Sequence, residues 1–478
     1  MNFVPPIQGG KFSTTSEEHE VMSSHAEESA SSDTSSPPDS PIFDGNDASR
    51  ERGHLRRRHG VDLHESSSIS SLSSIEQGDE APPAKLGHMD AYTQREIDLD
   101  LVKYPALDPA TQDAIVHKYR RLYKRIEDEG LFQCNYSAYA FEMCRYTFLF
   151  GMFLLTLRTG YFAVSGLLLG LLWHQLVFTV HDAGHMGITH NFQVDTVIGI
   201  IIADFIGGLS VGWWKRNHNV HHIVTNSPEH DPDIEHMPFF AISHRFFESL
   251  RSTYYDRIMT YDAVAKFTLR YQHYLYYPIL LFGRFNLYVL SWQFLFMGQG
   301  PRKGPAWWHR YLEIAGQLFF WYWFGYQVVY KSIPTAGSRW AFVLISHMVT
   351  APLHVQITLS HFAMSTADLG IHESFPQKML RTTMDVDCPQ WLDFIHGGLQ
   401  FQAIHHLYPR MPRHNLRRAQ KLVQEFCTEV GIPYAIYGFV DGNKEVIGRL
   451  AEVGRQATIL AECQKSLAKQ KNFGMHEI

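Results

Sequence analysis

Three short groups of histidines have the spacing of metal ligands. They are "HDAGH" with His181 and His185, "HNVHH" with His218, His221 and His222, and "QFQAIHH" with Gln402, His405 and His406. Side chains at i, i+3 and i+4 lie on one face of a helix, so each group can direct its imidazoles toward one point. Imidazole suits iron, copper, zinc and nickel. Because seven or eight imidazoles exceed what one tetrahedral zinc needs, the pattern predicts two metal ions.

A simpler interpretation applies to any one of these groups. A lone histidine at a membrane edge is more often a packed or interfacial side chain than a ligand. Three helix-spaced groups on one expected side of a membrane favour a joint site instead. The sequence contains no CxxC pair or acidic cage, so calcium and structural zinc fit poorly. The five cysteines are interpreted as scattered reduced thiols.

Apolar segments that could cross a bilayer surround the histidines. Segments 136–157 and 161–180 are separated by a tight turn and predict a helical hairpin. Segments 311–330 and 340–361 predict a second hairpin, in which we expect Pro352 to kink the last helix.

Two further apolar segments contain charged residues. Segment 194–214 has two aspartates, and segment 276–298 has Arg284 in its middle. We expect both to lie in the membrane interface or to re-enter, so that both hairpins return the chain to one side and the three histidine groups meet there. The Lys/Arg-rich run 117–125 precedes the first span, which assigns this side to the cytosol by the positive-inside rule.

Composition divides the chain into four parts. Residues 1–95 are rich in Ser, Glu and Pro and predict a disordered tail. Residues 96–135 predict a cytosolic amphipathic helical segment, with a helix that starts after the capping Asp108. Residues 136–420 form the predicted membrane domain, and residues 421–478 a cytosolic helical region. The expected fold is therefore an all-α integral membrane protein with two transmembrane hairpins, interfacial helices and a cytosolic helical cap that holds the metal site.

Neither charge nor leader sequence points to another class of protein. The basic run 117–125 is followed at once by the acidic stretch "IEDEG", so no nucleic-acid partner is predicted. No apolar stretch follows Met1, so no cleavable signal peptide is expected.

The order HxxxH, HxxHH and QxxHH resembles the three histidine boxes of the membrane fatty acid desaturase superfamily, over roughly residues 130–420. The Gln of the third box resembles the front-end type. The stretches "NHNVHHIVTNSPEHDPDIEHMPFF" and "LQFQAIHHLYPRMPRHNL" resemble Δ8-sphingolipid desaturases of fungi and plants, the fungal ones most closely. The resemblance implies a di-iron, O₂-dependent oxidoreductase of the endoplasmic reticulum membrane, with both termini cytosolic. Its expected reaction introduces a trans double bond at C8 of the long-chain base of ceramide.

The resemblance also implies a set of iron ligands. These are His181, His185, His218, His221, His222, His361, His405 and His406. His361 is included because a further histidine is expected from the last span, and "LSHF" matches it best. Gln402 stands where the family has the first His of its third box and is the candidate catalytic residue. We expect it to hydrogen-bond a water or a neighbouring imidazole, and its contact with iron stays open.

Other histidines of the apolar segments receive different interpretations. His347, His354 and His361 are spaced by seven residues and share a helix face. His347 would lie about 21 Å along the helix axis from His361, so both cannot serve one site, and we interpret His347 as a packed polar residue. For His354 the ligand and packing interpretations stay balanced, and His174 is interpreted as structural.

Three further features have weaker assignments. The loop "PEHDPDIEH", with Asp231 and Asp233, is interpreted as a polar loop near the substrate entrance. Asp182 and Asp393 are candidates to hold imidazoles through their second ring nitrogen. The run "FFWYWFGY" at 319–326 is a candidate tunnel lining, although interfacial anchoring is the favoured interpretation of its Trp and Tyr.

The expected reaction needs electrons from outside the chain. Front-end desaturases carry an N-terminal cytochrome b5 domain with an HPGG haem motif, and this sequence contains no HPGG. Either a separate cytochrome b5 with its reductase supplies the electrons, or the chain is a truncated form whose haem domain lay upstream. The opening "MNFVPPIQGGKF" resembles the linker that follows such a domain and favours truncation.

Three alternative functions stay open. A front-end fatty acyl desaturase of Δ5 or Δ6 type would have the same boxes. A histidine-rich zinc receptor or transporter would bind zinc and consume no O₂. A hydroxylase of the same metal class would differ only subtly in site geometry.

Overall fold

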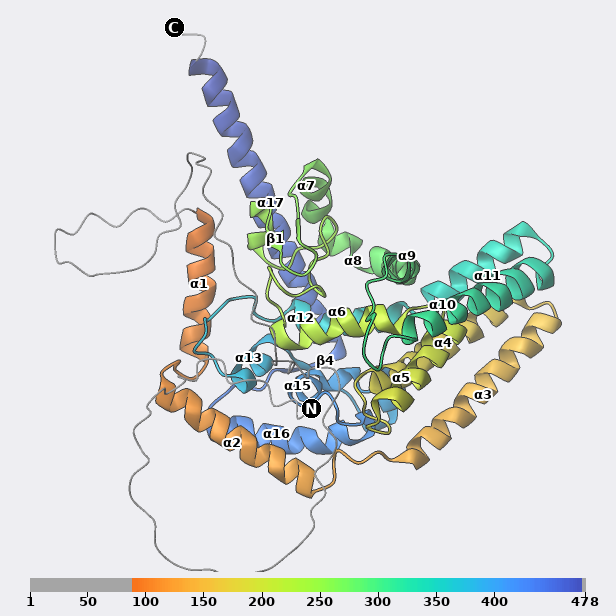
Figure 1. The fold of residues 1–478 in the computed structure, drawn as a ribbon. Helices are drawn as coiled ribbons and strands as arrows, with labels where there is room; N and C mark the ends of the chain where they lie inside the picture. Colours follow the sequence, from red (N-terminus) through yellow and green to blue (C-terminus); the bar gives the residue numbers. More distant parts are fainter. Residues whose placement is uncertain (1–87, 475–478) are drawn as a thin grey trace, which may run out of the picture.

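The computed structural model describes residues 88–474, which are mostly helical (Figure 1). The first helix, α1 (His88–Lys103), begins inside the range predicted as a tail, and the rest of that range lies outside the described residues. The next helix, α2 (Pro109–Asp128), confirms the predicted start, because the Asp108 carboxylate accepts a hydrogen bond of 3.0 Å from the Thr111 backbone N–H. This cap satisfies one of the free N–H groups of the first turn.

Within residues 88–474, three helices are long and apolar enough to cross a membrane. They are α3 (Tyr136–Arg158), α4 (Phe162–Gly184) and the run Ala336–Phe362, which consists of α11 (Ala336–Met348) and α12 (Ala351–Phe362). The break between α11 and α12 falls at residues 349–350, and Pro352 lies in the first turn of α12. Figure 1 shows α3, α4 and α11 side by side in one block.

The two apolar segments that contain charged residues do not form straight membrane-spanning helices. Segment 194–214 divides into α5 (Phe192–Ile200), the π-helix η1 (Ile201–Ile206) and the start of α6 (Val211–Val224). Segment 276–298 forms α8 (Gln272–Leu281) and α9 (Gly283–Phe296), which meet at 68° and form either a broken span or a re-entrant loop. Both observations agree with the expected interfacial or re-entrant character.

One arm of the predicted second hairpin is less apolar than expected. The segment 311–330 is helical, as α10 (His309–Phe320) continued by the π-helix η3 (Trp321–Ser332). It is not among the candidate membrane spans of residues 88–474, and it carries the polar side chains Glu313, Gln317 and Gln327. The helical fold is thus confirmed, while the two-hairpin topology stays a prediction.

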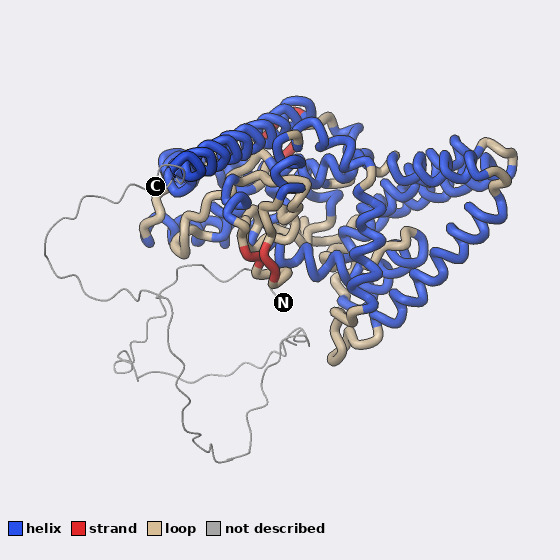
Figure 2. The backbone as a smooth tube through the Cα atoms, turned by 90° about the horizontal axis from the view of Figure 1, so that it is seen from above, coloured by secondary structure: helices blue, strands red, loops and turns tan. Residues whose placement is uncertain are grey.

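The remaining elements form the body beside this block (Figures 1 and 2). They are η2 (His244–Glu248), α7 (Ala263–Arg270), α13 (Phe375–Thr382), η4 (Gln390–Leu392), α14 (Asp393–His396), η5 (Leu399–Phe401), α15 (Gln402–Leu407), η6 (Arg413–Asn415), α16 (Leu416–Val430) and α17 (Phe439–Gly474). Strands β1 (Arg251–Ser252) and β2 (Arg257–Ile258) form an antiparallel hairpin. Strands β3 (Asp385–Asp387) and β4 (Ile436–Gly438) pair in parallel, with Asp385 opposite Ile436.

The membrane block and the body are stabilised by separate apolar cores. Phe153, Trp173, Phe320 and Phe342 join α3, α4, α10 and α11. A second core packs α2, α13, α15 and α16, and a third packs α7, α8 and α12 against α17. These cores fix α4, α12 and α15, whereas α6 packs through Val211 into a smaller cluster with Val180 of α4 and Ile200 of α5.

Close packing of α4 against α11 depends on small residues. A Cβ atom at Gly170 would lie 2.5 Å from the Ser346 carbonyl oxygen and 2.9 Å from the Val349 Cβ, whereas one at Gly151 on α3 would meet nothing within 4 Å. Small residues at such crossings let two membrane helices approach closely.

We predict that Gly170→Leu destabilises the protein by about 1–3 kcal/mol, because the side chain overpacks the α4–α11 contact. Gly151→Leu, which adds the same side chain on an open face, should leave stability near wild type. Thermal unfolding of both purified variants in detergent measures the difference. Equal melting temperatures for the two variants would contradict the close helix contact.

Candidate metal centre

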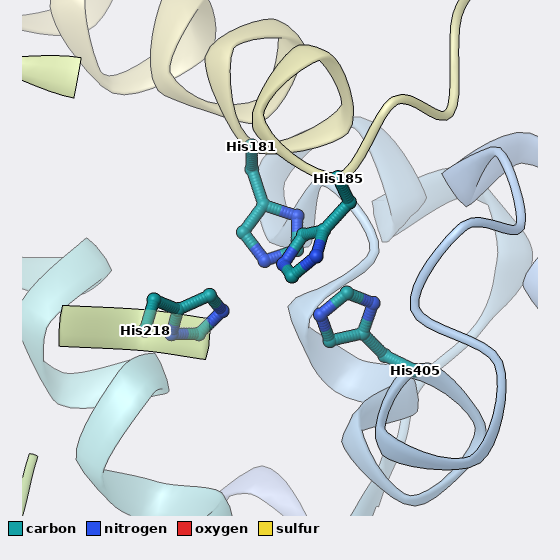
Figure 3. Close-up of side chains that lie close together, drawn as sticks. All are labelled: His181, His185, His218 and His405. Carbon is teal, nitrogen blue, oxygen red and sulfur yellow. The ribbon is translucent and has the colours of Figure 1, made fainter. Parts of the chain in front are cut away.

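The imidazoles of the three sequence groups and of His361 converge where the ends of four helices meet. Ligand atoms of His181, His185, His218 and His405 all lie within 4.8 Å of one another. Figure 3 shows these four rings pointing into a common space. The ligand atoms of His221, His361 and His406 form a second group of the same kind. The two groups draw on α4, α6, α12 and α15.

His222 lies between the two groups. Its Nε2 is 3.1 Å from His218 Nε2 and 3.1 Å from His405 Nε2. Its ring also stacks on His406, with the ring centroids 4.2 Å apart. All eight histidines predicted as ligands therefore belong to one continuous cluster.

The geometry of this cluster fits bound metal. Two imidazole nitrogens that each lie about 2.1 Å from one cation are about 3.0–3.4 Å apart when adjacent in an octahedral or tetrahedral shell, which matches the contacts of His222. Several ring nitrogens have no hydrogen-bond partner within residues 88–474: His181 Nε2, His185 Nε2, His361 Nδ1 and His406 Nε2. Buried polar atoms are normally paired, so these nitrogens are explained if cations occupy the spaces between them.

Burial also leaves these rings in the form that binds metal. Loss of solvent lowers the pKa values of His222, His405 and His406 well below the usual range, and neighbouring imidazoles lower them further. Neutral imidazole is the ligand form, so metal binding at these positions requires no proton release at neutral pH.

The end of α4 is shaped to admit an aromatic ring over the ligands. Trp214 of α6 stacks on His218 with a centroid distance of 4.5 Å and contacts His181 and His185 edge-on or tilted, at 5.4 and 5.5 Å. A Cβ at Gly184 would lie 2.2 Å from the Trp214 ring. Only glycine at this position lets the indole lie against three of the imidazoles.

The start of α6 is fixed by side chains from outside the helix. Ser210 caps it by accepting a 3.0 Å hydrogen bond from the Trp213 N–H. Glu313 of α10 accepts hydrogen bonds from the Ser210 hydroxyl at 2.5 Å and the Gly212 N–H at 3.0 Å. A carboxylate at a helix N-terminus is favourable, so Glu313 fixes the origin from which His218, His221 and His222 project.

Asp231 and Asp233 orient the histidines of α6. The interpretation of their loop as part of the substrate entrance did not include this role. Asp231 lies 2.9 and 3.0 Å from His221 Nδ1, and Asp233 lies 3.4 Å from His218 Nδ1. Burial lowers the pKa of His221, but the two carboxylates raise it to about 9. Metal-bound imidazoles commonly donate their second N–H to a carboxylate, so the signal that could have identified this pair was two acids shortly after the HxxHH group.

The carboxylates chosen for this role from the sequence have other partners. Asp182 accepts hydrogen bonds from the Tyr139 hydroxyl and Arg413, and Asp393 pairs with Arg417 at 2.5 Å. The expectation that Asp182 and Asp393 hold imidazoles was therefore wrong. They instead tie the end of α4 and the segment before α15 to the 413–417 region.

The short helix α15 depends on a buried carboxylate. Asp385 of β3 accepts hydrogen bonds from the Ala403 N–H at 2.8 Å and from Gln420 at 2.9 Å, and also from the Tyr434 hydroxyl. Next to α15, the Thr225 hydroxyl lies 3.1 Å from His406 Nδ1. These contacts set the direction in which His405 and His406 leave the helix.

The other residues selected from the sequence are placed as follows. Gln402 is buried on α15, and its Oε1 has no partner in the described part of the chain. His347 has both nitrogens engaged, by Tyr288 at 3.1 Å and the Val343 carbonyl at 2.8 Å, as expected for a packed residue. His174 contacts the Ile395 carbonyl at 2.9 Å, and His354 packs on Gly283. None of these three histidines belongs to the metal-binding groups found in the described residues.

Known proteins match the chain over the region that holds this centre. The fatty acid desaturase family model matches residues 159–438, which include all eight histidines. The chain is 65% identical over 476 residues to the Delta 8-(E)-sphingolipid desaturase of Emericella nidulans, covering 100% of this chain and 84% of that protein. It is 50% identical over 487 residues to the protein of that name from Kluyveromyces lactis, with 98% and 82% covered. It is 36% identical over 370 residues to the Delta(8)-fatty-acid desaturase of Helianthus annuus, with 76% and 78% covered.

We predict that Asp231→Asn lowers metal affinity about 10–100-fold, because His221 loses the carboxylate that orients its ring. Asp256→Asn is the matched control, since Asp256 is exposed and pairs only with Arg251 among the described residues. Metal bound per chain, measured under competition with a chelator, gives the comparison. Wild-type metal retention in Asp231→Asn would contradict the assigned role.

Proposed function

Because the chain belongs to the fatty acid desaturase family, we propose that it is a Δ8-sphingolipid desaturase, an oxidoreductase that uses O₂ to introduce a double bond at C8 of a long-chain base. The near-full-length identity to relatives of that name carries this proposal. The substrate we propose is ceramide, and the product has a trans double bond. The cluster of eight histidines supplies a site that suits the chemistry of the family.

Two iron ions are the cofactors we propose. His181, His185, His218, His222 and His405 would hold one ion, and His221, His361 and His406 the other. Iron with O₂ supplies the oxidising power to remove hydrogen from an unactivated methylene, which side chains cannot supply. The Gln402 amide oxygen, buried and unpaired among the described side chains, would accept a hydrogen bond from a water beside the second group.

The chain's own residues would position and shield the reaction. Trp214, Asp231 and Asp233 fix the ring planes of the α6 ligands, so little reorganisation is needed when substrate binds. Most of the cluster is buried, with His406 only 1% and His221 only 2% exposed, so bulk water is excluded from the reacting carbons. Holding one pair of carbons against such a site supplies the positional selectivity.

The placement of the histidines supports a membrane topology. His181 is in the last turn of α4 and His361 in the last turn of α12, so both membrane helices end at the same cluster. Two hairpins would return the chain to that side. One would consist of α3 and α4, and the other of α10 with η3 followed by α11 and α12. We propose that this side is cytosolic, that the membrane is the endoplasmic reticulum, and that cytochrome b5 with its reductase supplies two electrons per turnover there.

Lipid mass spectrometry in yeast tests the function. A strain without Δ8-unsaturated long-chain bases would express this chain alone or fused to a cytochrome b5 domain. We expect a new 8-unsaturated or 4,8-diunsaturated base in at least one of the two strains. A changed fatty acyl profile with no new base would assign the chain to the acyl desaturases, and bound zinc with neither lipid changed would favour a receptor or transporter.

We predict that His222→Ala abolishes iron binding and desaturation while the protein still inserts, because Nε2 of His222 lies 3.1 Å from Nε2 of both His218 and His405, two proposed ligands of one ion. His347→Ala removes an imidazole whose nitrogens are already bonded to Tyr288 and Val343, and it should keep substantial activity. Iron content and product yield of membrane-extracted protein separate the two variants. Full activity of His222→Ala would contradict the metal assignment.

A further inference from the structure

The helices α7 and α8 present a row of apolar and aromatic side chains at the surface. Residues three and four positions apart lie on one face of a helix, and the row keeps this spacing from one helix into the next. It consists of Val264, Phe267, Tyr271, Tyr274, Pro278 and Phe282, all of which are exposed. At the junction of the two helices the row is continuous, because the ring centroids of Phe267 and Tyr271 are 5.3 Å apart. We call these six side chains the outer row.

The opposite face of the two helices is fixed to the rest of the protein. Leu269 and Tyr276 are fully buried in the apolar core that includes α17. The Gln272 amide donates a hydrogen bond of 2.9 Å to the Leu450 carbonyl of α17, and a Cβ at Gly454 would lie only 2.8 Å from the Leu269 carbonyl oxygen. The packing against α17 therefore sets the orientation of α7 and α8 and leaves the outer row exposed.

The outer row continues the apolar surface of the membrane block. Helices α8 and α9 together form a candidate broken span or re-entrant loop, and α9 contacts α10 and α11. Exposed apolar side chains follow the same route, with Val289 and Phe296 on α9 and Leu318 and Phe319 on α10. Figure 1 shows α7, α8 and α9 one after another between α17 and the membrane block. Lipid that covers the block can therefore cover the outer row as well.

The charges of this segment indicate which part of the membrane it contacts. Residues 263–282 contain no Asp or Glu, whereas Lys266 and Arg270 are exposed on α7. Both cations lie beside aromatic rings, with Lys266 Nζ 5.5 Å from the Tyr261 centroid and the Arg270 guanidinium 5.6 Å from that of Tyr271. Basic residues next to an exposed aromatic and aliphatic face are typical of helices in the headgroup region. Anionic phospholipids attract such cations.

We propose that α7 and α8 lie in the membrane interface, with the outer row among the upper acyl chains and with Lys266 and Arg270 bound to anionic phospholipid. Helix α7 lies outside the apolar segments that the sequence indicated. The Tyr276 hydroxyl of α8 is 2.5 Å from the Thr358 hydroxyl of α12, the helix that ends at His361. Binding of the outer row to lipid thus also fixes the depth of a metal-binding helix relative to the bilayer. This inference does not depend on which reaction the protein catalyses.

Fluorescence quenching in lipid nanodiscs tests the contact with the bilayer. The full chain would carry a genetically encoded fluorescent amino acid in place of Tyr274, which is 72% exposed. The control chain carries it in place of Ile371, which is 70% exposed in the loop before α13. We expect phospholipid with a nitroxide near the top of its acyl chain to quench position 274 about threefold or more over position 371, because the apolar face of an interfacial helix is buried beneath the headgroups. Iodide in the aqueous phase should quench the two positions in the opposite order.

The same probe measures the preference for anionic lipid. Nitroxide-labelled phosphatidylserine should quench position 274 about fivefold more than labelled phosphatidylcholine at equal mole fraction, which is the enrichment expected for one basic residue near the surface. Lys266→Gln combined with Arg270→Gln should remove this preference. Arg121→Gln combined with Lys124→Gln, at exposed positions of α2, is the matched control and should retain it.

Equal quenching of positions 274 and 371 by lipid, with iodide reaching both, overturns the inference. Protection of position 274 from both quenchers also overturns it and assigns the outer row to a protein contact, such as a second copy of this chain. An unchanged preference for phosphatidylserine in the Lys266 and Arg270 double variant overturns the assigned lipid charge. If the chain with the probe at position 274 does not fold, as judged by its melting temperature, the probe replaces Phe267 instead.

Discussion

Eight imidazoles within one buried cluster are the constraint on which the rest of this protein depends. Nitrogens 3.1 Å apart with lone pairs facing one another repel unless a cation or a proton lies between them. Burial keeps the pKa values of these rings low, so the rings stay neutral, and a set of neutral imidazoles suits bound cations. Binding a cation requires helices that are far apart in sequence to place their ligand atoms around one point, within tenths of an ångström.

The fold fixes three of the ligand-bearing helices, α4, α6 and α15, at their ends. Glu313 and Ser210 hold the start of α6, and Asp385 holds the start of α15. Gly184 at the end of α4 admits Trp214, which touches rings from both α4 and α6. These contacts come from elements packed into different cores, so the centre is rigid only when the membrane block and the body are assembled together.

The sequence could predict what depends on local spacing. Histidines at helical intervals, a capping Asp108 before Pro109 and apolar runs of membrane length are all short-range patterns. The structure brings the three histidine groups together with His361, which only the family resemblance had selected. The hydrogen-bond partners of the imidazoles were harder to predict from the sequence. Asp182 and Asp393 are close to the histidines in sequence, yet they pair with Arg413 and Arg417, whereas Asp231 reaches His221 through a loop whose path no periodicity encodes. Hydropathy likewise could not explain the polar side chains of segment 311–330. In the structure, these side chains pack on η1 and support the start of α6.

Arg284 illustrates how a charge inside an apolar segment can serve the centre from a distance. Its guanidinium donates to the Gly207 carbonyl at 2.6 Å and to the Tyr288 hydroxyl at 3.2 Å, and it lies over the Trp173 ring at 4.1 Å. The Gly207 carbonyl follows the π-helix η1, where a helix end would otherwise leave an acceptor unpaired in an apolar environment. By satisfying it, Arg284 lets η1 end at Ile206 and α6 begin at Val211, with four intervening residues. The bend between α8 and α9 brings the arginine to this point, so the irregular segments of the membrane block are what allow a ligand helix to start beside α4.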